Sequence, residues 1–187
     1  MKKITEKVKS KFLVGKRTYL RPVELSDTRL IQTWHNDPEI RRLARLGELP
    51  ITYTKEEEDI KMARASSEET YLMIVETSGD RSIGFVRLNY IDTVSRNMWL
   101  RMIIGDVEAR GRNLTEDALR VVLEWLFAEQ NVHRITLEAY ASNKRAIHFF
   151  EKLGFRKEGV IREAVYAAGE YYDIVTLGLL NREFTST

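Results

Sequence analysis

One stretch, residues 103–119, limits what this chain can fold into more than any other part of it. An apolar run, Trp99–Ile104, predicts a buried strand, and a long amphipathic helical pattern begins a few residues later. The short polar loop between them holds Gly111, flanked by Arg110 and Arg112. The first turn of a helix leaves N–H groups unpaired and its dipole favours negative charge, and arginines suit phosphate oxygens. The stretch therefore predicts a binding site for a phosphorylated cofactor. The plainer alternative is a turn with solvated arginines that enters a core helix.

Composition narrows the classes of protein to consider. The 187 residues fit one domain, and a net charge of +2, from 30 basic and 28 acidic residues, gives no reason to expect a nucleic-acid partner. The absence of cysteine excludes disulfides, thiolate metal sites and a cysteine nucleophile. His35, His133 and His148 have no metal-ligand spacing, so no metal site is expected. No apolar run approaches the ~18 residues of a membrane span, so we expect a cytoplasmic protein without membrane contact.

The periodicity along the chain predicts one α/β domain over residues 1–187, in which the lysine-rich residues 1–11 form a flexible basic tail. The expected strands cover residues 12–23, 71–76, 83–91, 97–105, 134–140, 159–167 and 171–180. One helix is expected to start after the cap at Ser26-Asp27, and three more are expected over residues 54–65, 114–130 and 144–153. Short connections favour antiparallel pairs, whereas the strand–helix–strand order across 97–140 implies a right-handed crossover and a parallel pair. We expect a mixed, mostly antiparallel sheet of about seven strands flanked by about four helices.

Four stretches resemble the GNAT-type acyl-CoA N-acetyltransferases, and in particular their branch of ribosomal-protein N-terminal (alanine) acetyltransferases. They are Tyr19–Asp27 with Trp34–Glu39, the Arg110–Asn113 loop with its helix, Asn143–Phe155, and Gly159–Glu163 with Gly169–Asp173. The resemblance covers nearly the whole chain. It implies a single GNAT-like domain whose central strands splay apart to hold acetyl-CoA, and an enzyme that acetylates a primary amine.

The resemblance also implies roles for individual residues. The strand end at Ile103, Ile104 and Gly105 would offer backbone groups to the pantetheine arm and the thioester, and amides from Arg110 to Thr115 would hold the pyrophosphate. Asn143 would bind the pantetheine arm, although a plain helix N-cap explains it equally well. The full set expected at the cofactor is Ile103, Ile104, Gly105, Arg110, Gly111, Arg112, Asn113, Leu114, Thr115, Asn143, Phe150 and Lys152.

Two positions depart from the family pattern. The family loop usually runs Gln/Arg-x-x-Gly-x-Gly/Ala, but Glu108 and Asn113 stand at its ends here. A carboxylate at Glu108 repels phosphate unless it turns away, and the Asn113 side chain crowds the approach, although Asn tolerates unusual backbone angles. Phe150 stands where many members have a tyrosine that protonates the leaving thiolate. The acid must then be another group, Ser142 or Tyr140, or water.

Acyl transfer also needs a base that deprotonates the amine. Glu138 alternates with apolar neighbours on its strand and is expected to face the cleft, although a solvated role stays open. Trp34, Asp37 and Tyr172 are expected on the acceptor side. The acceptor could be a ribosomal or other protein N-terminus, a polyamine or another small amine, and the protein a monomer or homodimer. The alternatives are an inactive ligand-sensing or partner-binding module and, with less support, a nucleic-acid binder that uses Arg41, Arg42 and Arg45.

Overall fold

The chain folds around one eight-stranded sheet in the order β1-β2-β3-β4-β5-β6-β8-β7. The computed structural model describes residues 10–44 and 49–185. Its strands are β1 (Leu13–Val14), β2 (Thr18–Pro22), β3 (Glu69–Glu76), β4 (Arg81–Asp92), β5 (Asn97–Ile104), β6 (Arg134–Tyr140), β7 (Arg156–Ala167) and β8 (Glu170–Leu180). All neighbours pair antiparallel except β5 and β6, which pair in parallel. The mixed sheet and the single crossover are confirmed, and the described strands exceed the expected seven because 12–23 splits into two.

The described α-helices are α1 (Thr28–Asn36), α2 (Pro38–Leu43), α3 (Tyr53–Ala65), α4 (Leu114–Glu124) and α5 (Lys144–Lys152). The added helix is α2, which was not among the expected helices; Asp37 caps it and Pro38 stands in its first turn. α4 continues as one π-helical segment, η3 (Trp125–Glu129), so the long helix predicted over 114–130 is present with a change of winding. Short 3-10 turns are η1 (Leu25–Asp27), η2 (Val107–Ala109) and η4 (Asn181–Glu183). Most of the predicted tail, residues 1–9, and Arg45 lie outside the described residues.

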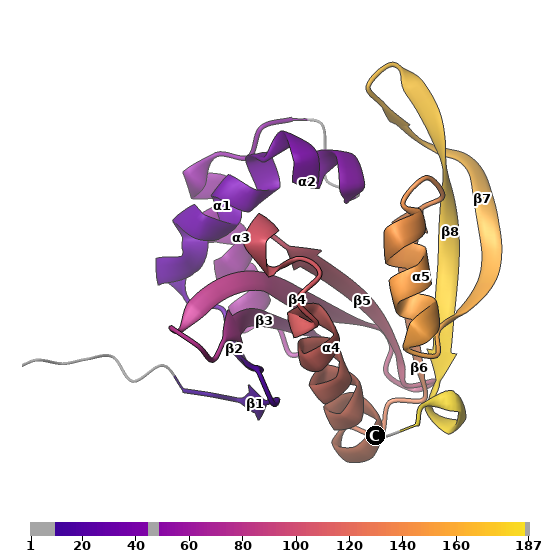
Figure 1. The fold of residues 1–187 in the computed structure, drawn as a ribbon, viewed down its shortest axis with the longest axis horizontal. Helices are drawn as coiled ribbons and strands as arrows, with labels where there is room; N and C mark the ends of the chain where they lie inside the picture. Colours follow the sequence, from indigo (N-terminus) through magenta and orange to yellow (C-terminus); the bar gives the residue numbers. More distant parts are fainter. Residues whose placement is uncertain (1–9, 45–48, 186–187) are drawn as a thin grey trace, which may run out of the picture.

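The two faces of the sheet carry separate hydrophobic cores. One core joins α4 and α5 to the sheet, and within α4 Leu114, Ala118, Leu119, Val122 and Leu123 are fully buried. The other lies beneath α1, α2 and α3, where Ile31, Ile40 and Ile60 are buried. Figure 1 shows these two layers, with α4 and α5 on the near face and α1–α3 gathered around the other half of the sheet. Burial of each such Leu or Ile contributes about 1.5–3 kcal/mol, so the helices that border the site are fixed by packing.

The β7–β8 hairpin stands apart from the rest of the sheet. All of β6 pairs with residues 174–180 of β8, and β7 forms the outer edge of the sheet. The rest of β8 pairs only with β7, so this end of the hairpin extends beyond the sheet. In Figure 1 the tip of the hairpin projects beyond α5, opposite the end of α2. Two walls from distant parts of the chain therefore face each other across the open end of the sheet.

Candidate active site

The two central strands part after three paired positions. Asn97–Trp99 of β5 pair with Arg134–Thr136 of β6, and beyond them the strands diverge. The splayed central pair implied by the family resemblance is therefore confirmed. The opening forms a cavity of about 460 Å³, here called the splay cavity, whose lining includes Ile103, Glu138, Tyr140, Asn143 and Phe150.

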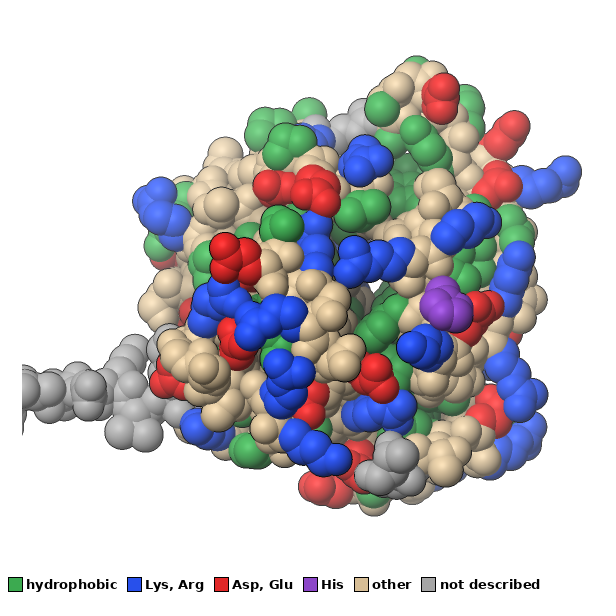
Figure 2. Space-filling view, in the orientation of Figure 1, with side chains coloured by type: hydrophobic (Ala, Val, Ile, Leu, Met, Phe, Trp, Pro, Cys, Tyr) green, Lys and Arg blue, Asp and Glu red, His purple; other side chains and the backbone are tan. Residues whose placement is uncertain are grey.

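A second cavity, of about 430 Å³, begins where β5 ends. This loop groove is bordered by α2, the end of β5, the loop before α4, and α5. Of the residues predicted at the cofactor, it is lined by Ile103, Ile104, Arg110, Gly111, Asn113, Thr115, Asn143, Phe150 and Lys152. Figure 2 shows Lys and Arg side chains on both sides of the hollow at the centre of this face. The structure thus gathers most of the predicted set around one positively bordered groove.

The loop before α4 has the backbone needed to approach an anion closely. Gly111 has φ +79° and Asn113 has φ +60°, both in the left-handed region. Asn113 precedes the first turn of α4, and its carbonyl accepts from the amide of Asp117 at 3.1 Å. The amides of the three residues between them, 114–116, precede the first intrahelical bond, so they are available at the end of the groove. The tolerance of asparagine for unusual backbone angles allows this conformation at Asn113.

The carboxylate that raised doubt about this loop points away from the groove. Glu108 accepts from Nη1 of Arg81 at 2.9 Å, and the same guanidinium pairs with Glu76 and Asp106 at 3.0 Å each. Three carboxylates surround Arg81 and raise its pKa, first through the hydrogen bonds that Arg81 donates to Glu108 and Glu76. Glu108 is thereby neutralised outside the groove and does not line it.

Three predicted cofactor residues are placed differently from the expectation. Gly105 donates its amide to the Ile83 carbonyl at 3.0 Å, and a Cβ there would come within 2.1 Å of the Trp34 ring, so it serves close packing. Arg112 does not line the groove, because it pairs with Glu76 at 2.8 Å. The side chain of Leu114 is fully buried in the core, which leaves only its amide for the groove.

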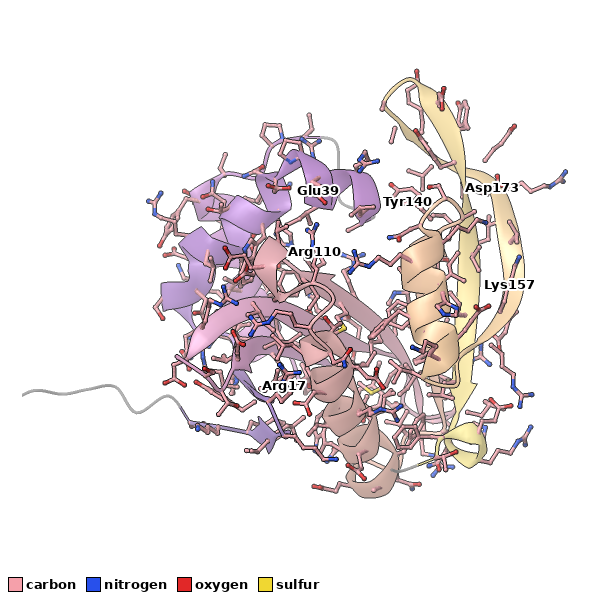
Figure 3. All side chains as sticks on the ribbon, viewed as in Figure 1. Arg17, Glu39, Arg110, Tyr140, Lys157 and Asp173 are labelled. Atoms are coloured by element: carbon pink, nitrogen blue, oxygen red, sulfur yellow. The ribbon has the colours of Figure 1, made fainter. Side chains whose placement is uncertain are left out.

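Arg110 lines the groove but already has two partners. Its amide donates to the Val107 carbonyl at 3.2 Å, so this N–H is not free for a pyrophosphate as predicted. Its Nη1 lies 2.5 Å from Oε1 of Glu39 on α2, and Figure 3 shows the two side chains adjacent to each other. Arg110 can therefore offer only its remaining guanidinium donors to the groove.

Sequence reasoning missed a cation on the opposite wall. Arg145 of α5 lines the loop groove, and a Cβ added to Gly111 would lie 3.7 Å from Nη2 of Arg145. His148 lines the same wall. The signal available was spacing: 145, 148 and 152 recur every three or four residues and so share one face of a helix that begins at Asn143.

Asn143 and Phe150 lie where the cavities meet. Asn143 caps α5 by accepting from the Ala146 amide at 3.1 Å, and its Nδ2 donates to the Leu43 carbonyl at 3.1 Å. The N-cap role left open by the sequence is therefore present, and a role toward the pantetheine arm stays a prediction. Phe150 lines both the splay cavity and the loop groove, and its ring packs edge-on against Phe149 and Phe155.

A third cavity, of about 1090 Å³, lies between α2 and the β7–β8 hairpin and is here called the hairpin pocket. Tyr172 and the two predicted proton donors, Tyr140 and Ser142, all line it. Tyr140 lies between α2 and the hairpin in Figure 3. Its ring packs edge-on against the ring of Tyr172, with 5.7 Å between the ring centroids. Tyr140 also lines the splay cavity, so the two cavities adjoin at this residue.

Trp34 and Asp37, predicted on the acceptor side, have other positions. Trp34 is 6% exposed, stacks on Phe85 and covers Gly105, and it lines none of the three cavities. The Asp37 carboxylate accepts from the amides of Glu39 and Ile40 at the start of α2. The contacts of these two side chains are packing and capping, and their role in substrate binding stays a prediction.

The residues present fit a cofactor with a pyrophosphate group. The left-handed backbone at Gly111 and Asn113, the helix start and the guanidinium of Arg145 are the donors that such a group needs. Among residues 10–44 and 49–185, no cluster of three or more acidic, histidine or cysteine side chains is arranged to hold a metal ion. No helix in that described part of the chain has the length and apolar character to cross a membrane.

Comparison with known proteins gives a consistent family. The acetyltransferase (GNAT) domain family matches residues 17–156. The spermidine N(1)-acetyltransferase of Vibrio cholerae serotype O1 is 26% identical over 165 residues, which are 88% of this chain and 94% of that protein. YdaF of Bacillus subtilis, to which a ribosomal N-acetyltransferase activity is provisionally assigned, is 29% identical over 101 residues, 54% of this chain and 55% of its own.

Similarity to solved structures supports the same fold. The crystal structure of Vibrio cholerae spermidine N-acetyltransferase in complex with CoA and spermine superposes with a TM-score of 0.83, at 24% identity, over 90% of this chain and 98% of that one. The family match covers β2 to β6, the described lining of the loop groove, and the described lining of the splay cavity except Ile174. The chain therefore belongs to the GNAT acetyltransferase family and is an N-acetyltransferase that uses acetyl-CoA.

Proposed function

We propose that the chain transfers the acetyl group of acetyl-CoA to the primary amine of a small molecule, by direct attack of the amine on the thioester. The observation that carries this proposal is that Asn143 lines all three cavities. The three cavities therefore adjoin at this residue, which supports an acceptor in the hairpin pocket beside a thioester in the splay cavity. The relatives named for spermidine acetylation support a small amine over a protein terminus.

The chain's own groups divide into those that bind and those that move protons. The amides at the start of α4, with Arg145 and Lys152, would hold the pyrophosphate end in the loop groove. The backbone of β5 beyond Trp99 pairs with β4 but not with β6, so the N–H and C=O groups on its β6 side are available to the pantetheine arm. When bound, acetyl-CoA supplies a thioester whose carbonyl carbon bonds to the amine nitrogen while the carbon–sulfur bond breaks.

Two protons must move during the reaction. A primary amine has a pKa of about 8–10 and must lose a proton before it attacks. Among the residues that the structure describes, Glu138 is the carboxylate that lines the splay cavity. The leaving thiolate must gain a proton, which Phe150 cannot give. Tyr140 lines both the splay cavity and the hairpin pocket, whereas Ser142 lines only the latter. This placement supports Tyr140 as the donor.

The protein-terminus acceptor expected from the ribosomal branch is the second candidate. It is favoured by the size of the hairpin pocket, which at about 1090 Å³ is large enough for several residues of a peptide. The partial match to YdaF also supports it, but over only 54% of this chain. A peptide panel separates it from the small-amine proposal.

The experiment incubates the purified protein with acetyl-CoA and either small amines, spermidine included, or peptides that begin with Ala or Ser. Because the chain has no cysteines, release of free CoA can be followed with a thiol reagent without background from the protein. Product mass then identifies the acetylated compound. Acetylated small amines with unmodified peptides support the proposal, acetylated peptides alone support the second candidate, and no product from any acceptor contradicts both.

The proposal keeps the expected cytoplasmic location and the expected monomeric or homodimeric state. Cell fractionation of the tagged protein tests the first. Sedimentation velocity of the purified chain tests the second, and a larger assembly would contradict it.

A further inference from the structure

We propose that Asn143 is a positioning residue, whose side chain holds the end of α2 against the start of α5 and so fixes one wall of the acceptor site. This inference rests on the proposed acetyl transfer and deepens it by naming the contact that keeps the acceptor wall in place.

A single amide side chain joins the ends of two helices. Oδ1 of Asn143 accepts from the Ala146 amide at 3.1 Å and caps the start of α5. Nδ2 of the same side chain donates to the Leu43 carbonyl at 3.1 Å. Leu43 is the last residue of α2, and the last carbonyls of a helix have no partner within the helix. Asn143 therefore supplies a donor that the end of α2 needs while it also caps α5.

This hydrogen bond lies where the three cavities adjoin. Among the described residues, Leu43 and Asn143 are the two that line the hairpin pocket, the splay cavity and the loop groove alike. Figure 1 shows the end of α2 facing the start of α5 at the open end of the sheet. A change in this one contact would therefore alter the shape of the junction between the acceptor and the thioester.

α2 is a short helix that depends on contacts with other segments. It has six residues, and isolated helices shorter than about 12–15 residues are marginal in water. Asp37 caps its start, and Glu39 in its first turn pairs with Arg110. Asn143 contacts the opposite end of the helix. Loss of the Asn143 donor should therefore loosen the end of α2 and leave its start in place.

The acceptor and the cofactor depend on α2 to different degrees. α2 supplies four of the described residues that line the hairpin pocket, and Leu43 is one of them. The donors expected at the pyrophosphate come instead from the start of α4 and from α5. A displaced α2 should therefore weaken binding of the acceptor more than binding of the cofactor.

The test uses two substitutions that keep the cap of α5 but remove the donor to Leu43. Asn143→Asp has no N–H group, and Asn143→Ser has a hydroxyl that lies one bond closer to the backbone, but both residue types cap helices well. Because Ser adds no charge, an effect shared by both variants comes from the lost hydrogen bond. Asn181→Asp is the matched control. Nδ2 of Asn181 also donates to distant carbonyls, those of Phe127 and Val132, and the residue lines none of the three cavities.

Hydrogen exchange followed by mass spectrometry gives a readout that does not depend on turnover. The Ala44 amide donates to the Ile40 carbonyl at 2.8 Å and reports on the end of α2. In both variants this end should exchange about fivefold faster or more, which corresponds to ~1 kcal/mol for one hydrogen bond, whereas α3 should be unchanged. At saturating acetyl-CoA the KM of the acceptor should likewise rise about fivefold or more, while the Kd of CoA stays within about twofold. The control should change neither quantity.

Equal exchange of α2 in the natural chain and in both Asn143 variants would overturn this inference, and so would an unchanged KM of the acceptor. The acetyltransferase proposal would stand in either case. Weaker CoA binding with unchanged exchange of α2 would overturn the inference in favour of a direct contact between Asn143 and the pantetheine arm. No turnover by the natural chain with any amine or peptide would instead overturn the proposed function, and the acceptor role inferred here with it.

Discussion

Asp117→Ala is expected to lower the free energy of unfolding by about 2–4 kcal/mol, because its carboxylate ties the β1–β2 turn to the start of α4. Oδ1 accepts from the Lys16 amide at 3.0 Å. Oδ2 accepts from the amides of Arg17 and Thr18 and from the Thr18 hydroxyl, at 3.0, 2.9 and 2.7 Å. Lys16 and Arg17 are exposed and can bind water instead, but Thr18 is fully buried. The cost therefore comes from two buried donors, at about 1–3 kcal/mol each, less partial relaxation.

A second variant and pH separate this explanation from a general loss of charge. Asp117→Asn keeps one acceptor oxygen, so it should cost about half as much as Asp117→Ala. Burial alone would raise the pKa of Asp117, but the hydrogen bonds from Thr18, Arg17 and Lys16 outweigh it and hold the pKa below its usual value. A group with a lowered folded pKa stabilises above its unfolded pKa of about 4 and loses that contribution as the pH falls through the folded value. The stability gap between the natural chain and Asp117→Asn should therefore shrink below about pH 4.

The assay is urea unfolding followed by tryptophan fluorescence, at neutral and acidic pH. Glu116→Gln is the matched control, because it removes another acid from the first turn of α4, where the helix dipole and an exposed pair with Arg120 contribute about 1 kcal/mol or less. The reasoning is refuted if Asp117→Ala costs no more than Glu116→Gln. It is also refuted if the free energies of unfolding of the natural chain and of Asp117→Asn differ by the same amount at pH 3 and at pH 7.

Three further changes test the site. Glu39→Gln releases Arg110 from its pair and removes a carboxylate from the loop groove, so CoA should bind several-fold more tightly by calorimetry; unchanged affinity would mean that Arg110 does not reach the cofactor. Glu138→Gln should lower kcat by about a hundredfold or more, whereas a kcat close to that of the natural chain would show that another group is the base. Phe150→Tyr places a hydroxyl at the junction of the splay cavity and the loop groove and should raise kcat, whereas an unchanged rate would show that proton donation there is not limiting.

The fold and the loop were predictable because their signals are local. Apolar runs and turn residues indicated most of the strands, and the 3.6-residue period indicated α4 before any contact was known. The left-handed conformation at Asn113 was not predicted, but it agrees with the tolerance of asparagine for unusual backbone angles. α2 was not among the expected helices, because it has only six residues and depends on the Asp37 cap for its start.

The positions of the side chains were harder to predict from the sequence, because they depend on contacts between segments that are distant along the chain. Trp34 is buried because Gly105, far along the chain, leaves room for its ring. Arg112 is drawn out of the groove by Glu76 on β3, which no local pattern indicates. The hairpin pocket is likewise built by α2 and β7–β8, and their opposition arises only when the sheet is assembled.

The most direct test of the central claim, that the loop groove binds the cofactor, is calorimetric titration of the natural chain and Gly111→Glu with CoA. Gly111 is exposed and its φ of +79° disfavours other residues, so the variant should remain folded, at a cost of about 1–2 kcal/mol, while a carboxylate enters the phosphate end of the groove. Micromolar binding by the natural chain and no detectable binding by the folded variant is the predicted result. Equal affinity in both proteins, or no heat from the natural chain at millimolar CoA, would contradict the assignment.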